Sequence, residues 1–139
     1  MDALETGRPI GRNVQGQPLL GKVEAVGPDE VVLLASLPRG KLQRIGVRLV
    51  SVDDEEAWVE VRTPVCEDHE LDPREALFRN CRLVVGHLEL RPDNRKYWYR
   101  HTLSLRDLRP PWARFAYVLA LIATVGDSIE HDITGFDRW

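Results

Sequence analysis

The sequence predicts an α+β domain, with an antiparallel sheet of about five strands and helices packed on the sheet. Three observations support this class. Short apolar or alternating runs follow one another between residues 31 and 62, a strong turn separates two further runs near residue 93, and a long apolar stretch begins at Trp112. Period-two alternation indicates half-buried strands, whereas a longer stretch with a 3.6-residue period indicates a helix. The predicted order is β-β-β-α-β-β-α, which suits helices lying on an antiparallel sheet.

The composition is that of one globular domain. The chain has 139 residues, of which 43% are hydrophobic and 29% charged, a balance typical of folded domains. Its formal charge of −3 gives no overall field that would attract nucleic acid or an anionic membrane. The first residues lack the pattern of a secretory signal, and Cys66 and Cys81 are too few for a disulfide framework. We therefore expect a cytoplasmic protein with free thiols that binds neither nucleic acid nor membrane.

Two segments of different composition are predicted. Residues 1–29 contain half of the glycines and three prolines, and only Leu19–Val26 has enough Leu and Val for a short strand or a turn of helix. We expect residues 1–29 to form a Gly/Pro-rich, partly ordered arm. Residues 30–139 are then expected to form the single α+β domain.

Three strands are predicted at the start of this domain. Val31–Leu37 is an apolar run of strand length. Residues 44–49 alternate apolar and polar side chains, and residues 57–62 alternate again after an acidic turn, which predicts an antiparallel hairpin. Basic side chains on and beside the first strand of this hairpin are expected to lie on a solvated face: Arg39, Lys41, Arg44 and Arg48.

A short helix and a second hairpin follow. Asp72 is a suitable N-cap and Pro73 a suitable first helical residue, so we expect a helix that ends at about Asn80. Pro-Asp-Asn at residues 92–94 predicts a turn between two strands. The resulting register would place four pairs on one apolar face: Leu90 with Tyr97, Leu88 with Tyr99, Gly86 with His101 and Val84 with Leu103. The other face would carry two pairs: Glu89 with Trp98 and His87 with Arg100.

The last predicted helix, from Trp112 to about Glu130, is apolar on two sides. One stripe suits contact with the sheet: Trp112, Phe115, Ala116, Leu119, Ile122 and Ala123. The opposite stripe is also largely apolar: Tyr117, Val118, Leu121 and Val125. Leaving large side chains in water forgoes about 1.5–3 kcal/mol each, so we expect something to cover them. The candidates are the N-terminal arm, a second copy of the chain in a homodimer, and a different protein partner.

The second hairpin also carries a family resemblance. The segment Leu83–Leu108, whose second strand reads Tyr-Trp-Tyr-Arg-His-Thr-Leu-Ser-Leu from Tyr97 and runs into a final helix, resembles the bacterial YbjN-type family. That family shares the type III secretion chaperone-like fold. The resemblance covers roughly residues 30–133 and implies a small, often dimeric protein that holds client segments against its sheet, or a regulator, with no catalyst known among its relatives. Two features depart from the family: residues 1–29 suit no amphipathic helix, and the last helix is unusually apolar on its outer side.

Other patterns in the sequence give little support to a metal-binding or catalytic site. Carboxylates and histidines gather at Glu67–Glu70 and at Asp127 with Glu130–Asp132, but neither group has a recognised metal-ligand spacing. We expect no metal or cofactor. The sequence contains neither a recognised catalytic serine or cysteine motif nor a phosphate-binding glycine loop.

The sequence therefore predicts a non-catalytic protein-binding module that acts as an adaptor, chaperone or regulator. Its interface is expected to combine the sheet surface with the last helix: Tyr117, Val118, Leu121, Val125, Trp98 and Arg100. The alternative is a small-ligand-binding or enzymatic domain that uses His87, Trp98 and Arg100. This alternative predicts a concave pocket beside these three side chains.

Overall fold

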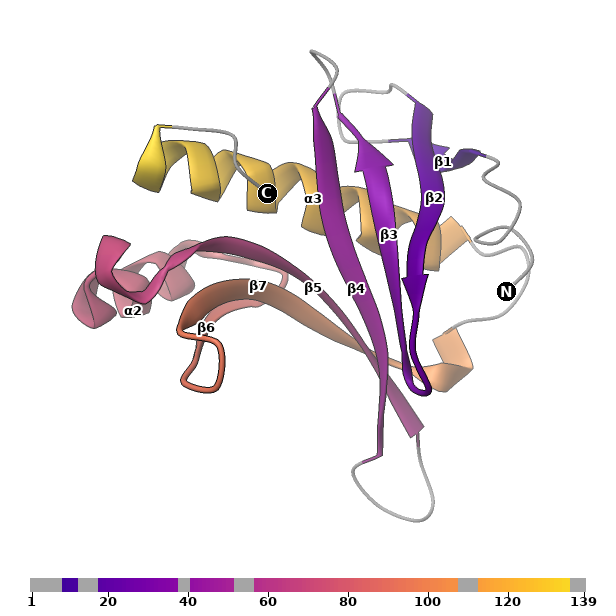
Figure 1. The fold of residues 1–139 in the computed structure, drawn as a ribbon, viewed down its shortest axis with the longest axis horizontal. Coiled ribbons are helices and arrows are strands. Elements are labelled where there is room, and N and C mark those ends of the chain that lie inside the picture. Colours follow the sequence, from indigo (N-terminus) through magenta and orange to yellow (C-terminus); the bar gives the residue numbers. More distant parts are fainter. Residues whose placement is uncertain (1–8, 13–17, 38–40, 52–56, 108–112, 136–139) are drawn as a thin grey trace.

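The computed structural model describes residues 9–12, 18–37, 41–51, 57–107 and 113–135 of the chain (Figure 1). The strands are β1 (Pro9–Arg12), β2 (Pro18–Val26), β3 (Glu30–Ser36), β4 (Leu42–Ser51), β5 (Ala57–Glu67), β6 (His87–Arg91) and β7 (Lys96–Ser104). The helices are α2 (Pro73–Arg82) and α3 (Ala113–Thr134), and short 3₁₀ turns follow β5 and β7.

The strands form one sheet in the order β1-β2-β3-β4-β5-β7-β6, and neighbouring strands are antiparallel. The fold is therefore α+β, as predicted, and from β3 onward the elements follow the predicted β-β-β-α-β-β-α order. The described sheet has seven strands rather than about five, because β1 and β2 come from the predicted arm. Ladder hydrogen bonds join backbone groups, so glycines do not prevent the pairing of β2 with β3 over Gly21–Val26. The sheet thus crosses the boundary predicted at residue 30.

The hairpin of β6 and β7 has the predicted register only near its turn. His87 with Arg100, Leu88 with Tyr99, Glu89 with Trp98 and Leu90 with Tyr97 are confirmed. The pairs predicted further from the turn are wrong, because β6 begins at His87 and Gly86 has a φ of +74°. A Cβ atom on Gly86 would lie 2.7 Å from the carbonyl oxygen of Arg100. The chain leaves the sheet there, and Val84 is 97% exposed instead of lying on the apolar face.

Helix α2 begins at its predicted cap and closes the edge of β6. Oδ1 of Asp72 accepts a hydrogen bond from the backbone N–H of Arg74 at 2.9 Å. At the other end of the helix, Nδ2 of Asn80 donates to the carbonyl oxygen of Leu88 at 3.2 Å, and the Leu88 N–H donates to Oδ1 of Asn80 at 2.7 Å. Since β6 is the last strand on this side of the sheet, one side chain satisfies two backbone groups of an edge strand.

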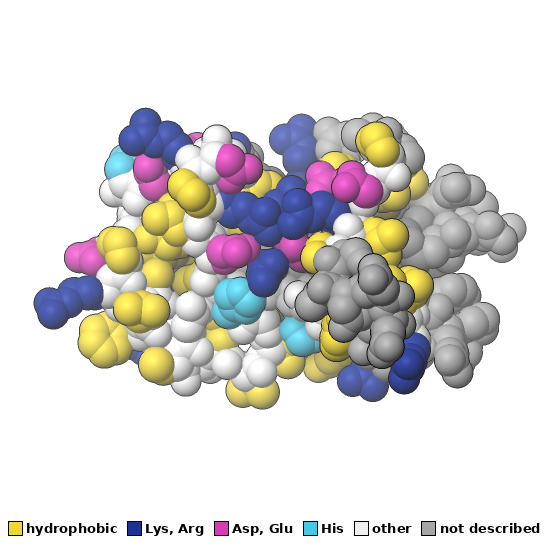
Figure 2. Space-filling model, turned by 90° about the horizontal axis from the view of Figure 1, so that it is seen from below, with side chains coloured by type: hydrophobic (Ala, Val, Ile, Leu, Met, Phe, Trp, Pro, Cys, Tyr) yellow, Lys and Arg dark blue, Asp and Glu magenta, His cyan; other side chains and the backbone are white. Residues whose placement is uncertain are grey.

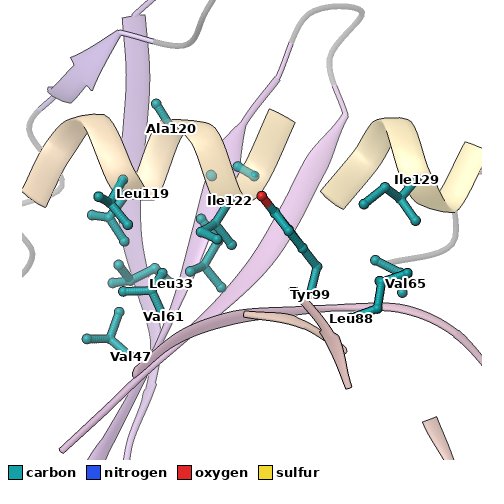
Figure 3. Packing of buried hydrophobic residues seen from close by; sticks show 14 of the residues in the cluster. Leu33, Val47, Val61, Val65, Leu88, Tyr99, Leu119, Ala120, Ile122 and Ile129 are labelled. Atoms are coloured by element: carbon teal, nitrogen blue, oxygen red, sulfur yellow. The ribbon is translucent and has the colours of Figure 1, made fainter. Parts of the chain in front are cut away.

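The hydrophobic core lies between α3 and one face of the sheet, which we call the inner face. Figure 3 shows Leu119 and Ile122 pointing from α3 toward Leu33 and Val61. All described members of the predicted core stripe are buried: Phe115, Ala116, Leu119, Ile122 and Ala123. The remaining member, Trp112, lies outside the described residues.

The sheet bends around α3, so the helix buries more than one stripe (Figure 1). Val118 from the second predicted stripe is buried, and Leu121 and Val125 are half-buried. Strand β1 also contacts α3, so part of the predicted arm lies against the helix. Tyr117 remains 58% exposed. The chain itself therefore covers much of the second apolar stripe of α3, for which a second copy or a protein partner was also considered as cover.

Helix α3 passes close to β5 at Gly126. A Cβ atom on Gly126 would lie 2.3 Å from Cγ2 of Thr63, so only glycine fits without movement. The Thr63 hydroxyl donates to the carbonyl oxygen of Arg44 at 2.6 Å and accepts from Nε2 of Gln43 at 2.7 Å. Gln43 and Thr63 are both fully buried. The helix therefore packs on a polar position within an otherwise apolar face.

Candidate binding site on the outer face of the sheet

The outer face of the sheet lies opposite α3 and carries most of the charged side chains of β4 to β7. Alternation along the strands places Arg48, Glu60 and Arg100 on this face, because their neighbours in sequence point toward α3. In Figure 2, which views the protein from below, Lys and Arg side chains form a continuous dark blue band across the middle of the surface, with acidic side chains and histidines beside it. The outer face therefore differs sharply in chemistry from the apolar inner face.

Glu60 is the centre of this charge cluster and is only 1% exposed. Its Oε2 atom accepts hydrogen bonds from Nη2 of Arg48 at 2.8 Å and from Nη1 of Arg100 at 3.1 Å. Its Oε1 atom accepts from Nη2 of Arg91 at 2.7 Å, and Nε of Arg62 lies 3.9 Å from the same oxygen. Arginines from four different strands thus enclose one carboxylate.

Electrostatics keep Glu60 ionised despite its burial. Burial alone would raise the pKa of Glu60, but the hydrogen bond from Arg48 and the charges of the surrounding arginines outweigh it, so this pKa lies below its ordinary value. Glu89 adds a second bridge, with Oε2 at 3.2 Å from Nε of Arg91 and 3.3 Å from Nε of Arg100. Each of these arginine side chains is less than a third exposed. The guanidinium groups are therefore held in fixed positions.

A pocket of about 170 Å³ opens beside this cluster. Four neighbouring strands line it: Glu30, Val32, Arg44, Gly46, Arg62, Pro64, Lys96 and Trp98. The Arg62 guanidinium lies 4.4 Å from the centre of the Trp98 ring, and Nη2 of Arg62 donates to Oε2 of Glu30 at 3.0 Å. Arg62 also approaches Glu60, so it forms a wall shared by the pocket and the cluster.

Basic side chains outnumber carboxylates among the residues that form the cluster and line the pocket. We use the term cationic face for six basic side chains and three carboxylates: Arg44, Arg48, Arg62, Arg91, Lys96, Arg100, Glu30, Glu60 and Glu89. Together they have a formal charge of +3, whereas the whole chain has a charge of −3. This set of side chains therefore has a charge opposite in sign to that of the whole chain.

The structure brings together the three residues predicted for a ligand site, but only one of them lines the pocket. Nε of Arg100 donates to Nε2 of His87 at 3.1 Å, so these two side chains bind each other. Trp98 lies on the same face, packs against Arg62 and donates from Nε1 to Oδ1 of Asn94 at 3.2 Å. The pocket extends from Trp98 toward β3 and is not lined by His87 or Arg100.

The residues predicted for a protein interface fall on two separate surfaces. Trp98 and Arg100 belong to the outer face, whereas the predicted helix residues lie on α3, at the inner face. Alternation on β7 explains the separation, because Tyr97 and Tyr99 point toward the core while Trp98 and Arg100 point away from it. Val118 is buried and cannot contact a partner in this conformation, which leaves Tyr117, Leu121 and Val125 partly accessible.

The acidic groups considered as metal ligands have protein partners. Nζ of Lys41 binds both Asp127 and Glu130, so the two α3 carboxylates are tied to the start of β4. Burial alone would lower the pKa of Lys41, but its hydrogen bonds to the two carboxylates outweigh this effect and raise it. Within the described ranges, no group of three or more potential ligands is arranged to hold a metal ion.

Lys41 and Arg48 also correct the prediction of a solvated basic face. Lys41 is mostly buried against α3, and Arg48 is bound to Glu60. Arg44 is exposed, and Arg39 lies outside the described residues. The carboxylates that bind Lys41 are 86 and 89 residues away in sequence, so a local pattern could not reveal them, whereas Glu60 lies opposite Arg48 in the β4–β5 hairpin.

Comparisons with protein-family models, with curated proteins and with solved structures found no match. Among the described helices, none is long and apolar enough to cross a membrane. The cationic face and its pocket are therefore the features from which a function can be inferred.

Proposed function

We propose that this chain is a non-catalytic binding module that holds a short acidic segment of a partner protein on its cationic face. The observation that carries this proposal is the enclosure of Glu60 by four arginines. The buried carboxylate fixes the guanidinium groups, and fixed groups lose less conformational entropy when they bind a ligand. Arginine suits such a site because its planar group can bind a carboxylate through two hydrogen bonds.

The charge distribution favours an acidic protein segment over nucleic acid. The cationic face has a formal charge of +3, so the rest of the chain carries −6 to account for the total of −3. A nucleic acid strand carries negative charge along its whole length, whereas the basic side chains of the cationic face are confined to one part of the sheet. A peptide of about eight residues, roughly 26 Å long when extended, stays within a surface of a few strands. A segment with several Asp or Glu residues therefore fits better than a nucleic acid strand.

The resemblance to the YbjN-type family supports the same class of function, because that resemblance implies client segments held against a sheet. The partly exposed Tyr117 and Leu121 offer a second surface, at the inner face, where a second copy of the chain could bind. That surface is smaller than the sequence predicts, since Val118 is buried. The cationic face is therefore the first surface to test.

The proposal is tested by the binding of a fluorescent peptide rich in Asp and Glu, measured by fluorescence anisotropy. Arg44→Glu reverses a charge on the face, and we expect it to weaken binding by about tenfold. Arg74→Glu is the matched control, because Arg74 is exposed on α2 and the change in charge is the same. Binding should also weaken as salt is added.

Two results would contradict the proposal. One is equal binding by the Arg44→Glu and Arg74→Glu variants, which would show that the acidic peptide does not use this face. The other is tighter binding of a single-stranded oligonucleotide than of the acidic peptide by the unmodified protein. Thermal unfolding of both variants checks that each one is folded.

A further inference from the structure

The pocket beside the cationic face differs from its surroundings in having an apolar interior. Val32, Pro64 and the Trp98 ring line it, and Gly46 contributes no side chain. A Cβ atom on Gly46 would lie 3.4 Å from Cγ of Arg62, 3.5 Å from Nε of Arg62 and 3.7 Å from Oε2 of Glu30, all within ordinary contact distance. A larger side chain at position 46 would therefore press on Arg62 and Glu30 and reduce the volume of the pocket.

The size of the pocket matches one ring. Its volume is about 170 Å³, and an apolar protein cavity of about 150 Å³ is known to hold one benzene molecule. The Trp98 ring offers a surface for offset or edge contacts with another aromatic ring. Arg62 is fixed by Trp98 and Glu30, so the wall that it forms is already in place before a ligand binds.

The charged side chains deep in the pocket are already paired with each other. Glu30 lines the pocket, and its Oε2 atom accepts a hydrogen bond from Arg62, so an uncharged ring can enter without separating an unpaired charge from water. Arg44 and Lys96 also line it, and they can attract the face of an aromatic ring or carboxylates on adjacent residues of the same ligand. This combination fits an aromatic residue flanked by acidic residues better than a phosphate or an isolated anion.

We infer that the pocket formed by Val32, Gly46, Pro64 and Trp98 receives an uncharged aromatic side chain of the acidic partner segment. This inference rests on the proposed function and adds the residue that anchors the segment. The cationic face attracts the acidic residues, while the pocket selects a segment with Phe, Tyr or Trp at the right position. A few well-buried aromatic residues commonly supply most of the affinity of such interfaces.

The test compares two fluorescent acidic peptides that differ only at a central Phe or Ala. We expect the unmodified protein to bind the Phe peptide about tenfold more tightly. Gly46→Val fills the pocket without changing charge, and β-branched residues suit strands. The variant should lose the preference for Phe while it binds the Ala peptide as the unmodified protein does. Thr102→Val, on the outer face but outside the pocket lining, is the matched control and should keep the preference.

The outcomes separate this inference from the proposed function. Failure of the unmodified protein to bind either acidic peptide would overturn both. Equal binding of the Phe and Ala peptides, or an unchanged preference in Gly46→Val, would overturn the aromatic pocket alone. Preference for a free aromatic carboxylate over the Phe peptide would also overturn it. Val32→Phe fills the pocket from β3 and replaces Gly46→Val if thermal unfolding shows that the latter does not fold.

Discussion

Glu60 and Glu130 are both fully buried carboxylates, yet they serve opposite faces of the sheet. Glu130 belongs to α3 and shares the ammonium group of Lys41 with Asp127. Glu60 belongs to the outer face and is enclosed by four guanidinium groups that remain partly exposed. The first arrangement ties a helix to the sheet. The second leaves guanidinium groups at the surface, so equal burial accompanies a structural contact in one place and the proposed binding surface in the other.

The largest expected effect is at Lys41. Lys41→Met removes the ammonium group that binds the buried Glu130, and we expect a loss of about 3–5 kcal/mol in the free energy of unfolding. Arg100→Gln should cost much less, about 1 kcal/mol, because other arginines still bind Glu60 and Arg100 is partly exposed. Urea unfolding measures both. Similar losses of unfolding free energy in the two variants would contradict the difference proposed between the structural ion pair of Glu130 and the charge cluster around Glu60.

A smaller effect is expected from adding one methyl group on each side of the sheet. Gly126→Ala places a Cβ atom 2.3 Å from Thr63, so the helix must move and the protein should lose about 1–3 kcal/mol of stability. Gly46→Ala meets no atom closer than 3.4 Å, and replacing a strand glycine should leave stability unchanged or raise it by about 0.5 kcal/mol. Thermal unfolding of the two variants compares the tightly packed inner face with the open outer face. Equal destabilisation would show that the outer face is packed as closely.

The smallest expected effect is a dependence of stability on pH that differs between the faces. On β7, burial and the charges of His87 and Arg114 lower the pKa of His101 below 6.5, so stability falls as the pH drops below that value. The lowered pKa of Glu60 contributes stability that is complete above pH 4.5 and is lost as the pH falls from there toward the folded-state value. His101→Gln should abolish the loss of stability that begins below pH 6.5 and leave the loss that begins below pH 4.5 unchanged. Urea unfolding at a series of pH values measures this, and an unchanged profile would argue against a role for His101.

Local sequence patterns predicted those parts of the fold in which neighbouring residues interact. The turn at residues 92–94 and the alternation around it correctly predicted that Leu88 pairs with Tyr99 and His87 with Arg100. The same pattern failed beyond His87, because Gly86 bends the chain away from the sheet. Strand β1 was not predicted, and β2 was predicted only as a short strand or a turn of helix at Leu19–Val26, since the pairing of both depends on a partner strand rather than on their own composition.

The candidate site was predictable only in part. Alternation places His87, Trp98 and Arg100 on one face, and this prediction agrees with the observed arrangement. The burial of Glu60 depends on Arg48, Arg91 and Arg100, which come from three other strands, so no local spacing indicates it. A signal was still present: a lone Glu between Val59 and Val61, on a strand facing basic residues of the preceding strand, suggests an ion pair across the hairpin.

Asn80 has a consequence for how a partner can approach. Its side chain forms hydrogen bonds with both backbone groups of Leu88, as a neighbouring strand would. A second chain that tried to extend the sheet beyond β6 would first have to break those two bonds, and sheets with protected edges resist uncontrolled growth. At this edge, the proposed acidic segment would therefore lie across the strands instead of alongside β6, and in that orientation it would reach side chains from several strands at once.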